Sequence, residues 1–170
     1  MKKIFALALA LMMLLCASAV AEELPAVYFD EAVMETVPGD FMLIPSCSLI
    51  LYVPEEMESM KLTEEDIAAG GIAAWMNDEN RVISVACASV TDGEGNAITD
   101  LETLNAFYNE SGIESTLGTV NDLPCLSFTV LDGTLGGIAF MTEEGEVLAF
   151  SCSPVDEVSA VVLSSIMLDE

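Results

Sequence analysis

The sequence predicts an α+β fold in which an antiparallel, meander-rich β-sheet is flanked by helices on both faces. Short apolar runs separated by Gly, Pro, Asn and Asp predict strands joined by tight turns. Two later segments combine a capping residue with apolar positions at helical spacing, which predicts helices. Residues 49–53 are apolar at every position, and a strand of this kind needs cover on both faces of its sheet. The predicted architecture is therefore an α/β/α sandwich.

The first 21 residues have the pattern of a secretory signal. Two lysines follow the initial methionine, residues 4–15 are apolar, and residues 19–21 are Ala-Val-Ala, a small-residue cleavage site. The apolar run is shorter than the roughly 20 residues that span a bilayer, so we expect cleavage after Ala21 and an extracellular protein rather than a retained anchor. No insertion of the mature chain into a membrane is expected, because the later apolar runs near residues 49–53 and 158–168 are short and interrupted by polar residues. The alternative is a chain lipid-anchored at Cys16.

Residues 22–39 are expected to form a loosely ordered leader ahead of one domain. Pro25, Pro38 and scattered acids interrupt any periodicity there, although an edge strand near residues 26–29 fits the pattern. Residues 40–170 contain no linker and no internal repeat. They are predicted to fold as a single α+β domain, since a chain of about 150 residues can bury a core of its own.

The first half of this domain predicts two pairs of strands with a short helix between them. Pro45 and Pro54 punctuate the first pair. Thr63 precedes an acid by three positions and two glycines follow, which predicts a short capped helix. The polar residues 77–80 predict a hairpin turn in the second pair. The strands are expected at residues 41–44, 49–53, 72–76 and 82–90.

The second half predicts a helix, a meander and a closing helix. Thr99 and Glu102 form a capping-box pattern, apolar residues recur at helical spacing to Tyr108, and Gly112 is suited to end this helix. Ser153 and the following proline predict the start of the last helix. Four strands joined by turns are expected between the helices, at residues 116–120, 126–131, 137–141 and 147–151.

Three short strings in this order of elements resemble a known superfamily. Tyr-Val-Pro-Glu-Glu at residues 52–56 precedes Leu-Thr-Glu-Glu-Asp at residues 62–66, and Val-Asn-Asp-Leu-Pro at residues 120–124 opens a strand. Over residues 41–170 the chain resembles the PsbP-like (Mog/PsbP) superfamily, in particular the small secreted members from anaerobic Gram-positive bacteria. The resemblance implies an α/β/α sandwich used mainly in binding or accessory roles, and it transfers no functional residue.

The charge of the chain limits its partners. Beyond residue 21 only Lys61 and Arg81 are basic, against all 29 acidic residues, so the formal net charge of that part is −27. Such a charge repels nucleic acid. We expect a monomeric, secreted, non-catalytic binding or accessory domain whose partner is an unknown protein or cell-surface component.

The residue types argue against an enzyme. Serine and cysteine nucleophiles usually rely on a histidine base, and the sequence has no histidine. Lys61 stands in a polar stretch, where a lysine keeps its proton. A hydrolase that uses paired carboxylates is a further alternative. Trp75, the only tryptophan, is interpreted as a core residue rather than a sugar platform.

An acidic, glycine-rich loop gives a second functional hypothesis. Asp92, Glu94, Asn96, Asp100 and Glu102 supply the hard oxygen ligands that calcium prefers, although their spacing is not that of an EF-hand. The protein could thus be an extracellular calcium-responsive protein. The other interpretation is a solvated loop before a capped helix, with no cofactor bound.

Four cysteines lie beyond residue 21, and the sequence leaves their state open. In an exported protein an even number predicts two disulfides, here with three possible pairings. Apolar neighbours favour free, buried thiols instead. These cysteines lack the close pairing typical of zinc sites. They are Cys47, Cys87, Cys125 and Cys152.

Overall fold

The structure is a computed structural model that describes residues 24–44, 47–130 and 132–169. The predicted signal, with the cleavage site after Ala21 and with Cys16, lies outside the described residues. None of the helices in the described part is long and apolar enough to cross a membrane. In chain order the elements are β1 (Ala26–Val27), η1 (Glu31–Glu35), β2 (Gly39–Ile44), β3 (Leu49–Pro54), β4 (Glu58–Ser59), α2 (Glu64–Ala68), β5 (Gly71–Met76), β6 (Val82–Ala88), β7 (Val90–Thr91), β8 (Ala97–Ile98), α3 (Leu101–Glu110), β9 (Glu114–Val120), β10 (Leu123–Val130), β11 (Leu135–Met141), β12 (Val147–Ser153), α4 (Glu157–Ser164) and β13 (Met167–Leu168).

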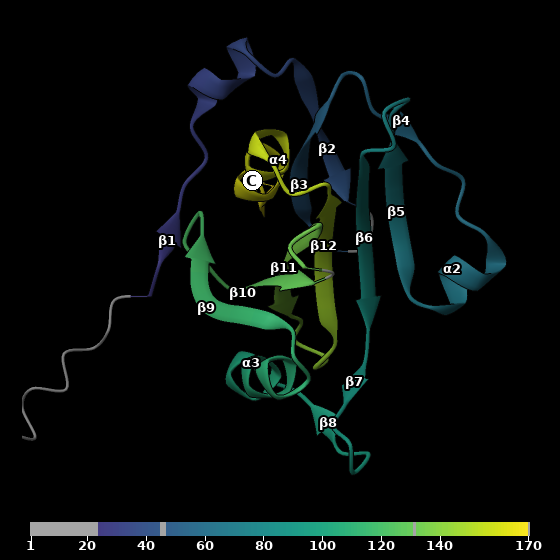
Figure 1. The fold of residues 1–170 in the computed structure, drawn as a ribbon, viewed down its shortest axis with the longest axis vertical. Helices are drawn as coiled ribbons and strands as arrows, with labels where there is room; N and C mark the ends of the chain where they lie inside the picture. The colour runs from purple at the N-terminus through teal and green to yellow at the C-terminus, as the bar shows by residue number, and fades with distance from the viewer. Residues whose placement is uncertain (1–23, 45–46, 131, 170) are drawn as a thin grey trace, which may run out of the picture.

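The main sheet is eight-stranded, in the order β1-β9-β10-β11-β12-β6-β5-β4 (Figure 1). Strands β9 to β12 form the antiparallel meander that the sequence predicts. Asn121 and Asp122 turn the chain between β9 and β10 with φ angles of 45° and 66°, as a two-residue hairpin requires. The hairpin of β5 and β6 joins the meander through β12. The α+β class is thus confirmed, and the main sheet is antiparallel except for β1, which pairs in parallel with β9.

A second, three-stranded sheet, in the order β13-β3-β2, was not expected from the sequence. The pattern correctly predicted β2 and β3 as strands, but it placed them in the same sheet as the meander. Together with α4, the small sheet packs on one face of the main sheet, where Leu51, Phe150 and Val162 share one core. The cover of this face is therefore supplied by strands as well as by a helix.

The opposite face of the main sheet packs on α3 through a second core. Leu104 of α3 is fully buried and belongs to this second core, together with Leu126 and Ala139. Their strand neighbours Cys125 and Ile138 belong to the first core, so consecutive residues point to opposite faces. This alternation explains why the strands are apolar on both sides. Trp75, 6% exposed, lies in the first core as predicted.

The helix starts agree with the sequence in one case and differ in two. Thr63 and Asp66 form the predicted capping box of α2. Helix α3 is capped by Asp100 rather than by Thr99, because the Asp100 carboxylate accepts the N–H of Thr103. Helix α4 is capped by Asp156 rather than by Ser153. Ser153 is the last residue of β12 and pairs there with Val82.

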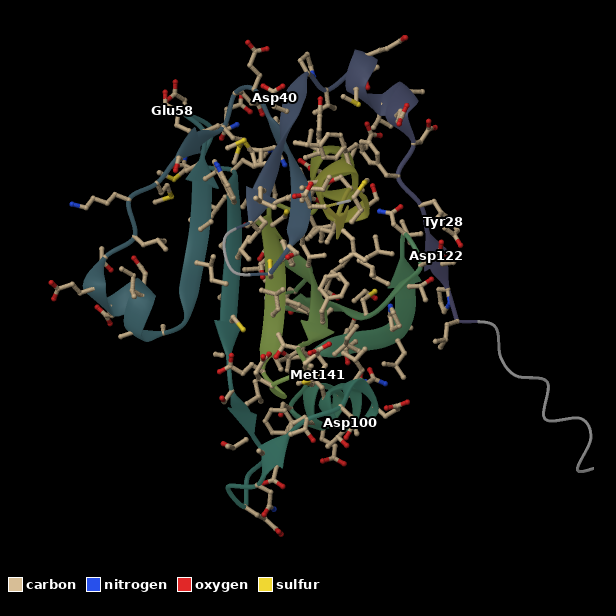
Figure 2. The ribbon with its side chains drawn as sticks, turned by 180° about the vertical axis from the view of Figure 1, so that it is seen from behind. Tyr28, Asp40, Glu58, Asp100, Asp122 and Met141 are labelled. Carbon is tan, nitrogen blue, oxygen red and sulfur yellow. The ribbon has the colours of Figure 1, made fainter. Side chains whose placement is uncertain are left out.

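Residues 24–39 run along the edge of the main sheet and then over the small one. Strand β1 pairs in parallel with β9, so the expected edge strand is present. The hydroxyl of Tyr28 donates to the Asp122 carboxylate at 2.8 Å, a contact whose residues are labelled in Figure 2. The ring of Phe29 lies 5.6 Å from that of Phe41 and 5.9 Å from that of Tyr52, measured between centroids. These contacts attach the segment to the domain.

Candidate functional site

The acidic loop predicted from the sequence is a hydrogen-bonded turn between β7 and β8. One Asp92 carboxylate oxygen accepts the backbone N–H groups of Glu94 at 2.9 Å and Asn96 at 2.8 Å. Its other oxygen accepts the Asn96 side-chain amide at 2.9 Å. The side-chain hydrogen bond from Asn96 is the main cause of the lowered pKa of Asp92. The carboxylate therefore closes its own turn.

The other two acids of the predicted calcium set belong to the first turn of α3 and its cap. Asp100 accepts the Thr103 N–H at 2.7 Å and the Thr103 hydroxyl at 2.8 Å, and these bonds lower its pKa. Glu102 follows in the first turn and is exposed, as is Glu94 in the loop. The structure thus brings Asp92 and Asn96 together and uses Asp100 as a helix cap.

Within the described ranges, no group of three or more His, Cys, Asp or Glu side chains is arranged to hold a metal ion. The geometry around Asp92 and Asp100 is that of a solvated turn before a capped helix. Calcium binding by these residues stays a prediction, and it gains no support from the contacts that their carboxylates make.

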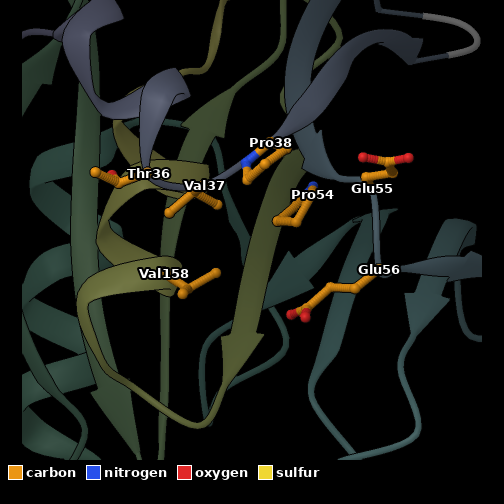
Figure 3. Close-up of a pocket in the computed structure, with 7 residues that line it drawn as sticks. All are labelled: Thr36, Val37, Pro38, Pro54, Glu55, Glu56 and Val158. Carbon is orange, nitrogen blue, oxygen red and sulfur yellow. The ribbon is translucent and has the colours of Figure 1, made fainter.

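A better candidate for a binding site than the acidic loop is a pocket of about 420 Å³, which the sequence did not predict (Figure 3). Three segments form it: the end of the loop before β2, the end of β3 with the two acids that follow, and the first turn of α4. No motif marks them, since the segments meet only after folding. The lining residues are Thr36, Val37, Pro38, Pro54, Glu55, Glu56 and Val158.

Two hydrogen bonds hold the walls of this pocket in place. The Tyr52 hydroxyl donates to the Val37 carbonyl at 2.7 Å, and the Glu55 N–H donates to the Pro38 carbonyl at 2.8 Å. Tyr52 itself is fully buried, so its ring is a firm support for the loop. Pro38 and Pro54 line the pocket with apolar rings, and their fixed φ angles restrict the backbone there. The walls are therefore apolar and stiff.

Carboxylates supply the charge of the pocket. Figure 3 shows Glu55 and Glu56 on the same side of it, with the Glu56 side chain extending toward Val158. Glu56 accepts the Asn77 side-chain amide at 3.1 Å through Oε1, and its side chain is still 57% exposed. Asn77 is held by the N–H of Arg81, which donates to its amide oxygen at 2.9 Å. The position of the Glu56 carboxylate is thus set by β-hairpin residues beneath it.

An ion pair neutralises the cation nearest to this site. Arg81 donates from Nη1 and Nη2 to the two Asp156 carboxylate oxygens at 2.8 and 2.7 Å, while its Nε lies 4.0 Å from Glu56. The hydrogen bond from Arg81 is the main cause of the lowered pKa of Asp156, and the same bond raises the pKa of Arg81. Among the described residues Lys61 is the other basic side chain, and it is exposed. The rim of the pocket is consequently anionic.

The four cysteines are free thiols in the structure. Cys125 and Cys152 are buried in the first core, and burial raises the pKa of Cys125 to about 11 and that of Cys152 to about 12. Cys47 and Cys87 are half-buried at its margin. Of the two alternatives left open by the sequence, the structure has the free thiols.

Comparisons with known proteins give a structural similarity but no sequence family. No known family model matches the chain, and no curated protein matches its sequence. The fold is similar to the solution structure of cyanobacterial PsbP (CyanoP) from Synechocystis sp. PCC 6803, with 12% sequence identity, a TM-score of 0.46, and coverage of 76% of this chain and 91% of that chain. The similarity concerns the arrangement of the chain alone.

Proposed function

We propose that the protein is a secreted, non-catalytic binding or accessory module whose partner is another protein or a cell-surface component. The observation that carries this proposal is the pocket between the loop before β2, the end of β3 and α4. Its volume of about 420 Å³ lies within the range of about 300 to 1,000 Å³ that is usual for ligand sites. Apolar walls with a few charged groups are also typical of such sites.

The chemistry of the pocket fits a lysine or arginine side chain from the partner. These side chains place an aliphatic stem on apolar surface and keep the cationic head at its margin. Val37, Pro54 and Val158 supply apolar wall for the stem. Glu55 and Glu56 supply carboxylates for the head, where a hydrogen bond between opposite charges is stronger than a neutral one.

The overall charge supports a basic partner. Outside the predicted signal, two basic residues stand against 29 acidic ones, and one of the two, Arg81, is already paired with Asp156. A field of one sign attracts a partner of opposite charge and raises its association rate. The non-catalytic part of the proposal rests on the composition, since the chain has no histidine to act as a base.

A capture experiment with matched variants tests this function. The immobilised protein from Glu22 onward is exposed to surface and secreted proteins of its source, and the affinity of each captured protein is then measured. The variant Glu55→Gln with Glu56→Gln is expected to weaken a specific partner at least about tenfold, or about 1.4 kcal/mol. The control, Glu64→Gln with Glu65→Gln on α2, removes the same charge from exposed positions away from the pocket.

The two variants separate a specific site from a general charge effect. Equal weakening by both would show that charge alone holds the partner, and the pocket would then have no role. Capture unaffected by either variant would also refute the pocket as the binding site.

A further inference from the structure

Strand β2 is an open edge of the small sheet. All six of its residues pair in continuous register with β3, from Gly39 opposite Pro54 to Ile44 opposite Leu49. No strand of the described chain lies on its other side. Alternate backbone groups of such a strand point away from its neighbour, so β2 presents a row of free N–H and C=O groups.

The other edges of the two larger sheets are short. Strands β1 and β4 end the main sheet and β13 ends the small sheet, and each of the three has two residues. Very short edge strands are a common protection against pairing with another chain. Strand β2 is three times as long, has no bulge, and contains neither Lys nor Pro. It therefore lacks the protection that the other edges have.

Large apolar side chains are exposed along this edge. Phe41, Met42 and Leu43 are consecutive and are 38%, 43% and 58% exposed. Phe41 and Leu43 lie on one face of the small sheet and Met42 on the other, so the open edge has exposed apolar side chains on both faces. Asp40 is the one charged residue of the strand, and Figure 2 shows it at the same end of the molecule as Glu58. An apolar edge is thus combined with nearby carboxylates.

The net negative charge of the chain indicates which kind of segment could pair with the open edge of β2. A second copy of the chain would add its own excess of acidic residues, and two such bodies repel each other. An extended segment with basic side chains meets the opposite potential. Main-chain hydrogen bonds would supply its affinity, and side chains on alternating sides would supply its specificity.

The geometry points to β2 as a strand-addition site for an extended, cationic polypeptide segment of the partner. This inference rests on the proposed function, because it assumes that the partner is a protein. It adds a second contact surface, formed by the backbone of residues 39–44, to the pocket described above.

The test uses a capped synthetic peptide of alternating lysine and valine as the probe, with the protein from Glu22 onward. The control peptide has the same side chains but is N-methylated at every amide, so it cannot donate to β2. We expect the control to bind at least about tenfold more weakly. Amide NMR shifts caused by the probe are expected to centre on β2.

Two protein variants carry the same change at different places. Leu43→Lys adds a cation to the edge, and Ile67→Lys adds one to α2, where the side chain is 60% exposed. Leu43→Lys is expected to weaken the probe at least about tenfold and Ile67→Lys by no more than about twofold. Circular dichroism confirms that both variants fold, since both positions are exposed.

Three outcomes would overturn the inference. The first is that the N-methylated peptide binds as well as the probe. The second is that both variants weaken binding equally. The third is that sedimentation shows a dimer that Leu43→Lys abolishes, which would mean that a second copy of the chain occupies the edge. The proposed function is judged separately. Natural partner capture that depends on Glu55 and Glu56 but is unaffected by Leu43→Lys would keep the binding module and refute strand addition at β2.

Discussion

Replacing Arg81 or Asp156 breaks the ion pair that joins the start of β6 to the start of α4. The two hydrogen bonds measure 2.7 and 2.8 Å, and the Arg81 side chain is 12% exposed, while that of Asp156 is 39% exposed. Hydrogen bonds to charged groups contribute about 1.5–3 kcal/mol each, but water screens the exposed side of Asp156 and lowers that contribution. We therefore expect a coupling free energy of about 1–2 kcal/mol between the two side chains.

The two single variants are expected to differ. Asp156→Ser keeps a capping residue for α4 but leaves the guanidinium of Arg81, whose side chain is 12% exposed, with only Glu56 at 4.0 Å, so it should lower the free energy of unfolding by about 2–3 kcal/mol. Arg81→Met keeps the apolar packing and also removes Nε, a buried atom without a hydrogen-bond partner. Its cost should be smaller, about 1–2 kcal/mol.

Urea denaturation followed by fluorescence of Trp75, the single tryptophan, measures both effects and completes a double-mutant cycle. The pKa of Asp156 is lowered in the folded protein. Its contribution is therefore full above the unfolded value of about 3.9 and is lost as the pH falls through the folded pKa. The difference between wild type and Arg81→Met should shrink below about pH 4. A coupling below about 0.5 kcal/mol, or Arg81→Met costing more than Asp156→Ser, would refute this reasoning.

Four further predictions concern processing, salt, calcium and thiols. Intact-mass analysis of the exported protein should place its N-terminus at Glu22, and a lipid-modified cysteine there would contradict this. Raising sodium chloride from about 0.01 to 0.15 M shortens the Debye length from about 30 to 8 Å, so the melting temperature should rise as carboxylate repulsion is screened. Millimolar calcium should then add no more stability than magnesium at equal ionic strength, whereas a calcium-specific increase lost in Asp92→Asn with Glu94→Gln would restore the calcium hypothesis. Native alkylation should modify the half-buried Cys47 before Cys152, whose pKa burial raises to about 12, and equal rates would contradict the buried position of Cys152.

Local chemistry made most strands and one helix start predictable. Asn121 and Asp122 are residues that tolerate positive φ angles, so their residue types alone are enough to place the turn between β9 and β10. The capping box of α2 is formed by Thr63 and Asp66 alone, which lie within four positions of the sequence. The start of α4 was misplaced because Ser153 also fits a cap, and only its pairing with Val82 shows that it belongs to a strand.

The candidate site was less predictable. The acidic loop was visible because Asp92 and Asn96 are close in sequence, but their contacts are those of a turn. The pocket was missed, since Pro38, Glu56 and Val158 become neighbours only when β2, β3 and α4 come together. The buried Tyr52 was one available signal: a tyrosine inside an apolar strand needs a partner for its hydroxyl, and that partner is the loop that forms the pocket wall.

By itself the sequence determined the α+β class, the antiparallel meander and the acidic character of the chain, and it predicts export. These properties depend on residue types and on neighbours within a few positions, where turn, capping and alternation rules apply. Only the tertiary structure decided that β2 and β3 form a separate sheet, that Arg81 pairs with Asp156, and that β2 keeps one edge open. The physical reason is that the apolar pattern of a strand such as β3 is satisfied in any sheet that buries both of its faces, so the pattern does not select one sheet over another. The choice between sheets is made by packing over long sequence separations, which short-range patterns do not record.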